Sequence, residues 1–288
     1  MNASVRSLSA TPHAGEREFP FGDAEFAFIA ELVFARSGIV LGPSKQNMVY
    51  SRLVRRLREL GLPTFSDYCD LVGSPDGADE IGHLINAITT NLTRFFRENH
   101  HFEHLGATVV PDLAKRDARR IRIWSAGCSS GEEPYSIAIT VADRLAGLGS
   151  FDVKILATDL DTNMVAHGRA GIYGRAALEG VPGATVAKHF KREPGGDRFA
   201  VRPPARDLIT FKPLNLLGPW PMKGPFDAIF CRNVMIYFDN PTKFELVRRF
   251  SELLAPGGWL YIGHAETLLG QQEIFKTAGR TIYRKIES

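Results

Sequence analysis

The segment that most constrains the fold runs from residue 121 to residue 135 and reads IRIWSAGCSSGEEPY. Its first residues, Ile121 to Trp124, are mostly apolar and β-prone, which predicts a strand. The small residues between Gly127 and Gly131 predict a tight turn. Pro134 stands where the first turn of a helix tolerates proline. The segment therefore predicts strand, turn and helix in direct succession.

Two glutamates directly after this turn narrow the kind of ligand that it would bind. In doubly wound sheets, the turn after the first strand binds nucleotide-like ligands, and their phosphates lie at the helix N-terminus. Glu132 and Glu133 suit the positive end of that helix, but they would repel a pyrophosphate. A ligand with positive charge and no phosphate fits better, such as S-adenosylmethionine with its sulfonium and ammonium groups. Asp159 directly follows the predicted strand 153–158, where adenosine needs an acidic residue. The alternative is a helix capped by its own glutamates beside an ordinary loop aspartate.

Length and composition set broader limits. With 288 residues, 44% hydrophobic and 23% charged, the chain can form two modest globular domains. A formal charge of +3 does not by itself predict binding to nucleic acid or to a membrane. The three cysteines are far apart and form no C-x-x-C motif, so neither a disulfide framework nor a metal site is expected. The first residues lack the apolar core of a signal peptide, and no run is long enough to span a membrane. We therefore expect a cytoplasmic protein with a mobile tail over residues 1–20.

Residues 21–90 have the pattern of an all-helical domain. Apolar residues at helical spacing predict helices over residues 23–37, 44–60, 66–72 and 76–90. Ser44 is the expected N-cap of the second helix. On that helix Arg52, Arg55 and Arg56 share one outward face, on which we expect no acidic partner. Such a face is a solvated surface, a nucleic-acid contact or a docking site for an acidic protein.

The segment TTNLTRFFRENHHF, residues 89–102, joins this domain to the next one. Its polar and cationic residues are candidates for lining a cleft at the junction, and the alternative is a capped helix start with two core phenylalanines. Three nearby histidines, His100, His101 and His104, raise the question of a metal site. No H-E-x-x-H motif accompanies them, so we interpret them as solvated helix residues.

Residues 91–288 predict an α/β domain with a mainly parallel, doubly wound sheet. Six strands are expected, at residues 121–124, 153–159, 209–214, 226–231, 259–263 and 281–286. A seventh strand cannot be placed. Between them, residues 168–205 are rich in Gly, Pro and Arg and break the alternation. We expect part of this region to form a small inserted antiparallel β-subdomain, with short strands near 198–201 and 208–211 around a Pro-Pro turn.

Five segments together resemble the chemotaxis receptor methyltransferases of the CheR family. They are TTNLTRFFRE at 89–98, WSAGCSSGEEPYS at 124–136, ATDLD at 157–161, FCRNVMIYFD at 230–239 and LAPGGWLYIGHAE at 254–266. The resemblance implies a class I S-adenosylmethionine-dependent methyltransferase fold without a metal. It also implies methyl transfer to glutamate side chains of chemoreceptor cytoplasmic regions, with S-adenosylhomocysteine as the second product.

The resemblance further implies roles for individual residues. The cofactor pocket would be formed by Asn91, Thr93, Arg97, Glu133, Asp159, Asn215, Leu216, Arg232 and Asn233. Glu133 would lie at the methionine end, Asp159 at the ribose, and Asn215 with Leu216 at the adenine. Arg97 and Tyr237 would orient the accepting carboxylate. The family's basic second helix matches Arg52, Arg55 and Arg56, which would contact the receptor.

In some members of the family the β-subdomain also grips a peptide at the receptor's C-terminus. The loop from Lys191 to Arg198 is short for such a grip.

Other classes of function fit the residues less well. A methyltransferase acting on base amino groups commonly has an N-P-P-Y-like tetrad after the fourth strand, where this chain has Cys231 to Val234. A nicotinamide-dependent oxidoreductase is disfavoured by the glycine spacing and the paired glutamates. A module that only senses S-adenosylmethionine would have no use for Arg97 or Tyr237 beside the methyl group. An S-adenosylmethionine-dependent enzyme acting on another protein or on nucleic acid remains the alternative.

Overall fold

The computed structural model describes residues 17–268 and 270–287, and the chain divides into two compact units. One unit comprises Met1–Ala35 with Leu41–Ile88, and the other comprises Arg36–Val40 with Thr89–Ser288. Residues 1–16 of the expected tail lie outside the described residues. Within the described ranges, no helix has both the length and the apolar content needed to cross a membrane.

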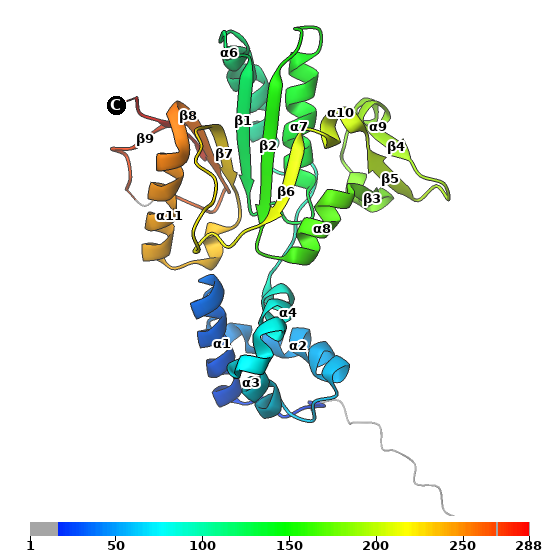
Figure 1. The fold of residues 1–288 in the computed structure, drawn as a ribbon, viewed down its shortest axis with the longest axis vertical. Coiled ribbons are helices and arrows are strands. Elements are labelled where there is room, and N and C mark those ends of the chain that lie inside the picture. The colour runs from blue at the N-terminus through cyan, green and yellow to red at the C-terminus, as the bar shows by residue number, and fades with distance from the viewer. Residues whose placement is uncertain (1–16, 269, 288) are drawn as a thin grey trace, which may run out of the picture. The chain divides into compact units, whose positions relative to one another are not determined.

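The described part of the first unit consists of helices (Figure 1). They are α1 (Asp23–Ser37), α2 (Gln46–Leu60), α3 (Phe65–Gly73) and α4 (Ala78–Ile88), with short 3₁₀ turns at Pro43–Lys45 and Pro75–Gly77. Their apolar faces meet in a core that contains Ile29, Leu53 and Tyr68, all fully buried. The expected cap at Ser44 is wrong, because Ser44 lies inside the 3₁₀ turn and α2 has no side-chain cap.

The second unit is built on a seven-stranded sheet in its described part. The strands are β1 (Arg120–Ala126), β2 (Asp152–Asp159), β6 (Ile209–Pro213), β7 (Phe226–Cys231), β8 (Leu254–Ile262), β9 (Phe275–Gly279) and β10 (Ile282–Lys285). Their order is β6-β2-β1-β7-β8-β10-β9, with the first five parallel and β10 antiparallel to both of its neighbours. This topology confirms the doubly wound sheet. The strand that could not be placed is β9, where only Phe275 is buried, so its sequence gives no alternating pattern.

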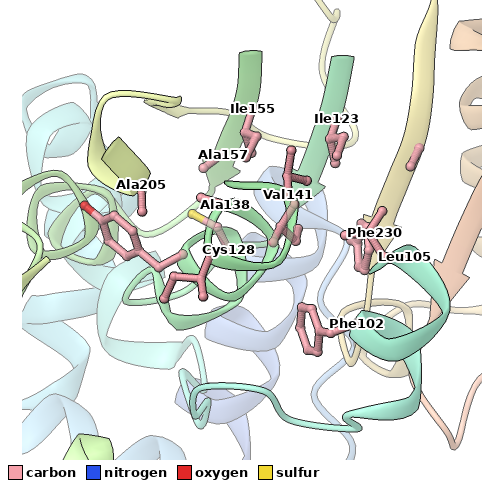
Figure 2. Close-up of a cluster of buried hydrophobic side chains, with 14 of the residues drawn as sticks. Phe102, Leu105, Ile123, Cys128, Ala138, Val141, Ile155, Ala157, Ala205 and Phe230 are labelled. Carbon is pink, nitrogen blue, oxygen red and sulfur yellow. The ribbon is translucent and has the colours of Figure 1, made fainter. Parts of the chain in front are cut away.

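Helices lie on both faces of this sheet (Figure 1). Its central strands β1, β7 and β8 are mostly buried. They are α7 (Glu132–Leu145), α8 (Thr162–Ala170), α11 (Asn240–Leu253), and a continuous helical segment made of α5 (His100–His104), a π-helical turn (Leu105–Val109) and α6 (Val110–Ala114). Figure 2 shows Ile123 of β1, Ile155 of β2 and Phe230 of β7 in one apolar cluster with Val141 of α7 and Phe102 of α5. Because the central strands β1 and β7 are buried on both faces, the loops that follow them emerge at the ends of the sheet.

The inserted β-subdomain is present and lies between β2 and β6 in the chain. Three short antiparallel strands, β3 (Ile172–Gly174), β4 (Phe190–Arg192) and β5 (Arg198–Val201), form a second sheet in the order β3-β5-β4. Short helical segments accompany them: a 3₁₀ turn at Arg175–Leu178, α9 (Gly183–His189) and α10 (Pro203–Arg206).

Two details of the insertion differ from expectation. The Pro-Pro segment begins α10 instead of a turn, because proline is favoured in the first turn of a helix. Residues 208–211 belong to β6 of the main sheet, which pairs in parallel with β2.

Candidate cofactor site at the carboxyl edge of the sheet

The turn after β1 has a backbone that few residue types can adopt. Its first two N–H groups, of Gly127 and Cys128, donate to the carbonyl of Thr158 at 2.8 and 2.9 Å, which fixes the turn against β2. Gly127, Ser129 and Gly131 all have positive φ angles. A Cβ at Gly131 would lie 2.7 Å from the hydroxyl oxygen of Tyr173, so only glycine fits there. The predicted strand, turn and helix are confirmed, and strained backbone of this kind clusters at functional sites.

Asp159 at the end of β2 lies directly beside this turn. One carboxylate oxygen accepts from the Ser129 N–H at 2.7 Å, and the other accepts from the Asp161 N–H at 2.9 Å. The residue is only 9% exposed, and burial raises the pKa of its carboxyl group. Since a carboxylate has about four acceptor positions, lone pairs remain for further donors such as ribose hydroxyls.

Asn91 is brought to the same place by Asp161, a residue that the sequence analysis did not assign. The Asn91 side-chain amide donates to Asp161 at 2.8 Å, and the Asn91 carbonyl accepts from the Ser129 hydroxyl at 3.0 Å. Asp161 also caps α8 by accepting from the N–H groups of Asn163 and Met164. An aspartate just before a helix is an N-cap signal that could have identified it.

Arg232, just after β7, is a buried cation between two carboxylates. Its side chain is 2% exposed and lies 3.1 Å from Glu133 and 3.6 Å from Glu98. It also donates to the carbonyl of Arg97, and the Ser125 hydroxyl donates to Glu133 at 2.7 Å. Burial raises the pKa of Glu133, while Arg232 works in the opposite direction. The arrangement therefore joins Glu133 and Arg232, two residues predicted for the cofactor pocket.

Glu98 is a second residue of the site that was not predicted, although it lies inside the segment TTNLTRFFRE at 89–98. Its φ angle is 56°, and its carboxylate lies 3.1 Å from the His264 ring and 3.4 Å from the Asn233 amide. Partial burial works to raise the pKa of Glu98, but His264 and Arg232 hold it below its ordinary value. We call Arg97, Glu98, Glu133, Arg232 and Asn233 the Arg232 cluster.

The loop that carries Asn233 and Tyr237 is held by a buried glutamate, Glu266. Its carboxylate accepts from the N–H of Asn233 at 3.0 Å, of Ile236 at 3.2 Å and also of Gly263. Asn233 has a φ of 60°. Tyr237 follows in a 3₁₀ turn and is partly exposed, with its hydroxyl 3.5 Å from the carbonyl of Thr90.

The other predicted pocket residues are less closely tied to these groups. The Arg97 guanidinium donates to the carbonyl of Leu92 at 2.8 Å and remains 27% exposed, and Thr93 is partly exposed. Asn215 donates to the carbonyl of Arg36 at 2.7 Å, and Leu216 next to it is buried. Both follow β6 at the same carboxyl edge of the sheet.

Two expectations about charged residues are wrong. The arginine face of α2 does have acidic partners: Arg55 contacts Glu59 at 2.7 Å, and Arg56 makes a two-pronged ion pair with buried Glu80 at 2.7 and 3.0 Å. Arg52 donates to the carbonyls of Ala87 and Ile88. Glu59 follows Arg55 by four residues and Arg56 by three on the same helix, so the sequence spacing alone could have predicted this contact.

The expectation of solvated helix histidines is wrong for His101, whereas His100 and His104 are only partly buried. His101 is fully buried, with its ring 3.0 Å from the Thr281 hydroxyl, and His104 lies 2.9 Å from the Tyr261 hydroxyl. Burial and the nearby charge of Arg232 lower the pKa of His101 to about 3. Among the described residues, no group of three or more His, Cys, Asp and Glu side chains is arranged to hold a metal ion.

Comparison with known proteins gives the family. Residues 91–284 match the family described as CheR methyltransferase, SAM binding domain, and residues 24–89 match CheR methyltransferase, all-alpha domain. A probable chemotaxis protein methyltransferase of Rhizobium etli is 47% identical, over 88% of this chain and 96% of its own length. The chemotaxis protein methyltransferase of Escherichia coli is 45% identical, over 91% and 90%. Chemotaxis protein methyltransferase 2 of Pseudomonas aeruginosa is 42% identical, over 95% and 97%. The chain has the class I fold and belongs to the CheR family of S-adenosylmethionine-dependent chemotaxis methyltransferases.

Proposed function

We propose that this chain transfers the methyl group of S-adenosylmethionine to glutamate side chains of chemoreceptor cytoplasmic regions, which gives methyl esters and S-adenosylhomocysteine. The observation that carries the proposal is the distribution of charge at the carboxyl edge of the sheet. Asp159 and Glu133 supply buried acid beside the glycine turn, and Arg97 supplies a partly exposed cation. Acid suits a cationic donor, and the exposed arginine suits an anionic acceptor. A cytoplasmic location is part of this proposal, because the acceptor glutamates are in receptor cytoplasmic regions.

The donor set fits this cofactor in kind. Asp159 would hold the ribose hydroxyls, and Glu133 the amino-acid end. Asn91 and Thr93 would border the pocket from the segment before α5, and Asn215 with Leu216 would border the adenine. Arg232 and Asn233 would close it. When bound, S-adenosylmethionine supplies a methyl group on a positively charged sulfur.

The residues of this chain then have to align the acceptor. A glutamate carboxylate is already ionised near neutral pH, so no general base is required to make it a nucleophile. One carboxylate oxygen of the acceptor would bond to the methyl carbon while the carbon–sulfur bond breaks. The electron pair of the carbon–sulfur bond would stay on sulfur. Arg97 would hold the carboxylate by paired hydrogen bonds, and Tyr237 would add one more. Alignment of this kind can contribute several kcal/mol to the reaction.

Arg97 gives the sharpest test, because Arg94 on the same segment is a matched control. Arg94 is exposed and three residues away. We expect Arg97→Ala to abolish transfer of radiolabelled methyl groups to a receptor cytoplasmic fragment, with unchanged thermal unfolding, and Arg94→Ala to retain it. The product should be base-labile, as an ester is. Near-normal turnover in Arg97→Ala would remove Arg97 from this role, and a base-stable product would indicate another acceptor, such as a different protein group or nucleic acid.

Receptor contact by α2 is the second part of the proposal. Arg55 is the best candidate, because its side chain is 83% exposed and its pair with Glu59 lies at the surface. Arg52 and Arg56 are poorer test sites, since Arg52 bonds to carbonyls of α4 and Arg56 to buried Glu80. We expect Arg55→Glu to raise the KM for receptor without changing affinity for S-adenosylhomocysteine. Arg248→Glu on α11 is the control, because Arg248 is also an exposed arginine between two glutamates of its own helix. An equal KM in both variants would make the α2 face ordinary surface.

A receptor C-terminal peptide could be bound by the β-subdomain through its edge strands. Strand β4 is an edge strand and exposes Lys191 and Arg192. An open strand edge can pair with an added peptide strand. We expect removal of the receptor's last residues to raise the KM for receptor. An unchanged KM would show that the short loop before Arg198 does not serve as a tether in this chain.

A further inference from the structure

A cavity lies beside the outer edge of β6. Its volume is about 470 Å³, which is within the range of small-ligand sites. Residues of four elements form its wall: Tyr135 of α7, Arg169 of α8, Arg206 and Asp207 at the end of α10, and residues 209–212 of β6. Figure 1 shows β6 at the margin of the sheet, with α8 and the inserted subdomain next to it.

The cavity carries an excess of positive charge. Arg169, Arg206 and Lys212 line it, and the only carboxylate in the lining is Asp207. Asp207 lies 3.4 Å from Arg206, both at the surface. Within residues 17–268 and 270–287, neither Arg169 nor Lys212 forms an ion pair. Two cations therefore remain without a counter-charge in one concave site.

One of these cations is held in place by the backbone. The Arg169 guanidinium donates through Nη2 to the carbonyl of Phe211 at 3.1 Å, which anchors it at β6. An arginine has five N–H donors in a planar fork, so most of the fork remains for a ligand. This fork matches the geometry of phosphate oxygens, whereas a flexible lysine such as Lys212 adds a point charge.

We propose that this cavity binds a phosphate-bearing small molecule. The charge excludes the cationic cofactor, and the size fits a diphosphate or a nucleotide. None of the residues assigned above to the cofactor or to the acceptor lines the cavity. The proposal is therefore independent of the proposed methyl acceptor. A simpler explanation for Lys212 is that lysine on an edge strand prevents pairing with other chains.

Calorimetric titration of the full chain with inorganic pyrophosphate tests the proposal. Saturating S-adenosylhomocysteine is present throughout, so that the cofactor site cannot take up the probe. We expect saturable binding with one site, and we expect Lys212→Glu and Arg169→Gln each to weaken it tenfold or more. Lys276→Glu is the matched control, since Lys276 is an exposed lysine on β9, the opposite edge strand of the same sheet. It should bind pyrophosphate as the unchanged protein does.

A second titration with GTP distinguishes the source of the phosphate. Tighter binding of GTP than of pyrophosphate would identify a nucleotide, with the base against the wall of the cavity, and equal affinity would identify a simple diphosphate. The proposal is overturned by absence of saturable binding, or by equal affinity in Lys212→Glu and Lys276→Glu. Binding of an acidic peptide without binding of either phosphate probe would also overturn it. Circular dichroism of each variant shows whether lost binding comes with lost folding, and Arg169→Lys, which keeps the charge, should retain part of the affinity if the variant folds.

Discussion

Replacing Arg232 by methionine should expose how strongly the Arg232 cluster depends on its central cation. Arg232 is 2% exposed and lies 3.1 Å from Glu133, whose side chain is 10% exposed. Methionine replaces the aliphatic part of arginine and carries no charge, so the change removes the cation and leaves only a small cavity. It leaves Glu133 and Glu98 as carboxylates without their central partner in a buried setting.

The size of the effect follows from the burial of this pair. Removing one partner of a buried ion pair costs about 3–5 kcal/mol, because the remaining charge is uncompensated. For a unit of this size, a change of 1 kcal/mol shifts the melting temperature by about 2–4 °C. We therefore expect Arg232→Met to lower the melting temperature by about 6–20 °C near pH 8.

The effect should depend on pH in a defined direction. Burial already raises the pKa of Glu133 in the folded protein, and Arg232 works against that rise. Without Arg232 the folded-state pKa rises further above that of the unfolded chain, which is about 4.3. A group of this kind contributes stability below its unfolded pKa and loses it as pH rises through the folded pKa. The difference in unfolding free energy between the two proteins should therefore shrink as pH falls from 8 toward 5.

Urea unfolding followed by tryptophan fluorescence measures this directly. All three tryptophans, Trp124, Trp220 and Trp259, lie in the unit that contains Arg232. Addition of Glu133→Gln to Arg232→Met should restore part of the stability, because it removes an uncompensated charge. Arg248→Met is the control and should change the free energy of unfolding far less than Arg232→Met does, because exposed ion pairs contribute little. The prediction would be wrong if Arg232→Met lowered the free energy of unfolding by less than about 1 kcal/mol and if neither pH nor the addition of Glu133→Gln changed that difference.

Three further predictions concern other parts of the molecule. Gly131→Ala should reduce S-adenosylhomocysteine affinity in calorimetry. It should also destabilise the protein by more than about 1–3 kcal/mol, because the added Cβ clashes with its neighbours in addition to straining the backbone. Gly147 also has a positive φ but open space around it, so Gly147→Ala should show the strain alone and keep that affinity. His101→Gln should reduce the loss of stability below pH 6.5. The folded-state pKa of His101 is about 3, so between about pH 6.5 and pH 3 only the unfolded chain binds the proton, and the free energy of unfolding falls by about 1.4 kcal/mol per pH unit. Identical acid unfolding of both proteins would contradict this. In thermal unfolding, Arg56→Ala should destabilise the helical unit by about 2 kcal/mol or more, because it leaves buried Glu80 without its partner. Arg55→Ala should destabilise it by about 0.5 kcal/mol or less, because the Arg55–Glu59 pair is at the surface. Equal effects would show that the pair with Glu80 contributes little.

The sequence alone determined those features that depend on neighbouring residues. The strand, turn and helix of residues 121–135 could be predicted because the glycines, the β-prone strand and the first-turn proline act within a few residues of one another. The parallel strand β7 was identifiable for the same reason, since burial on both faces gives a near-continuous apolar run. Recognition of the family relied on such local segments.

The tertiary structure decided which distant residues meet. Arg232 and Glu133 are 99 positions apart, and Arg56 and Glu80 are 24 apart, so no local pattern predicts either pair. His101 reads as a surface residue of a polar segment, but the sheet and Arg280–Thr281 cover it. Strand β9 forms although its exposed side chains give no pattern, because β10 supplies its hydrogen bonds. In each case the stabilising contacts exist only after the chain has folded. Burial and charge pairing depend on residues that are close in space and not on neighbours in the sequence.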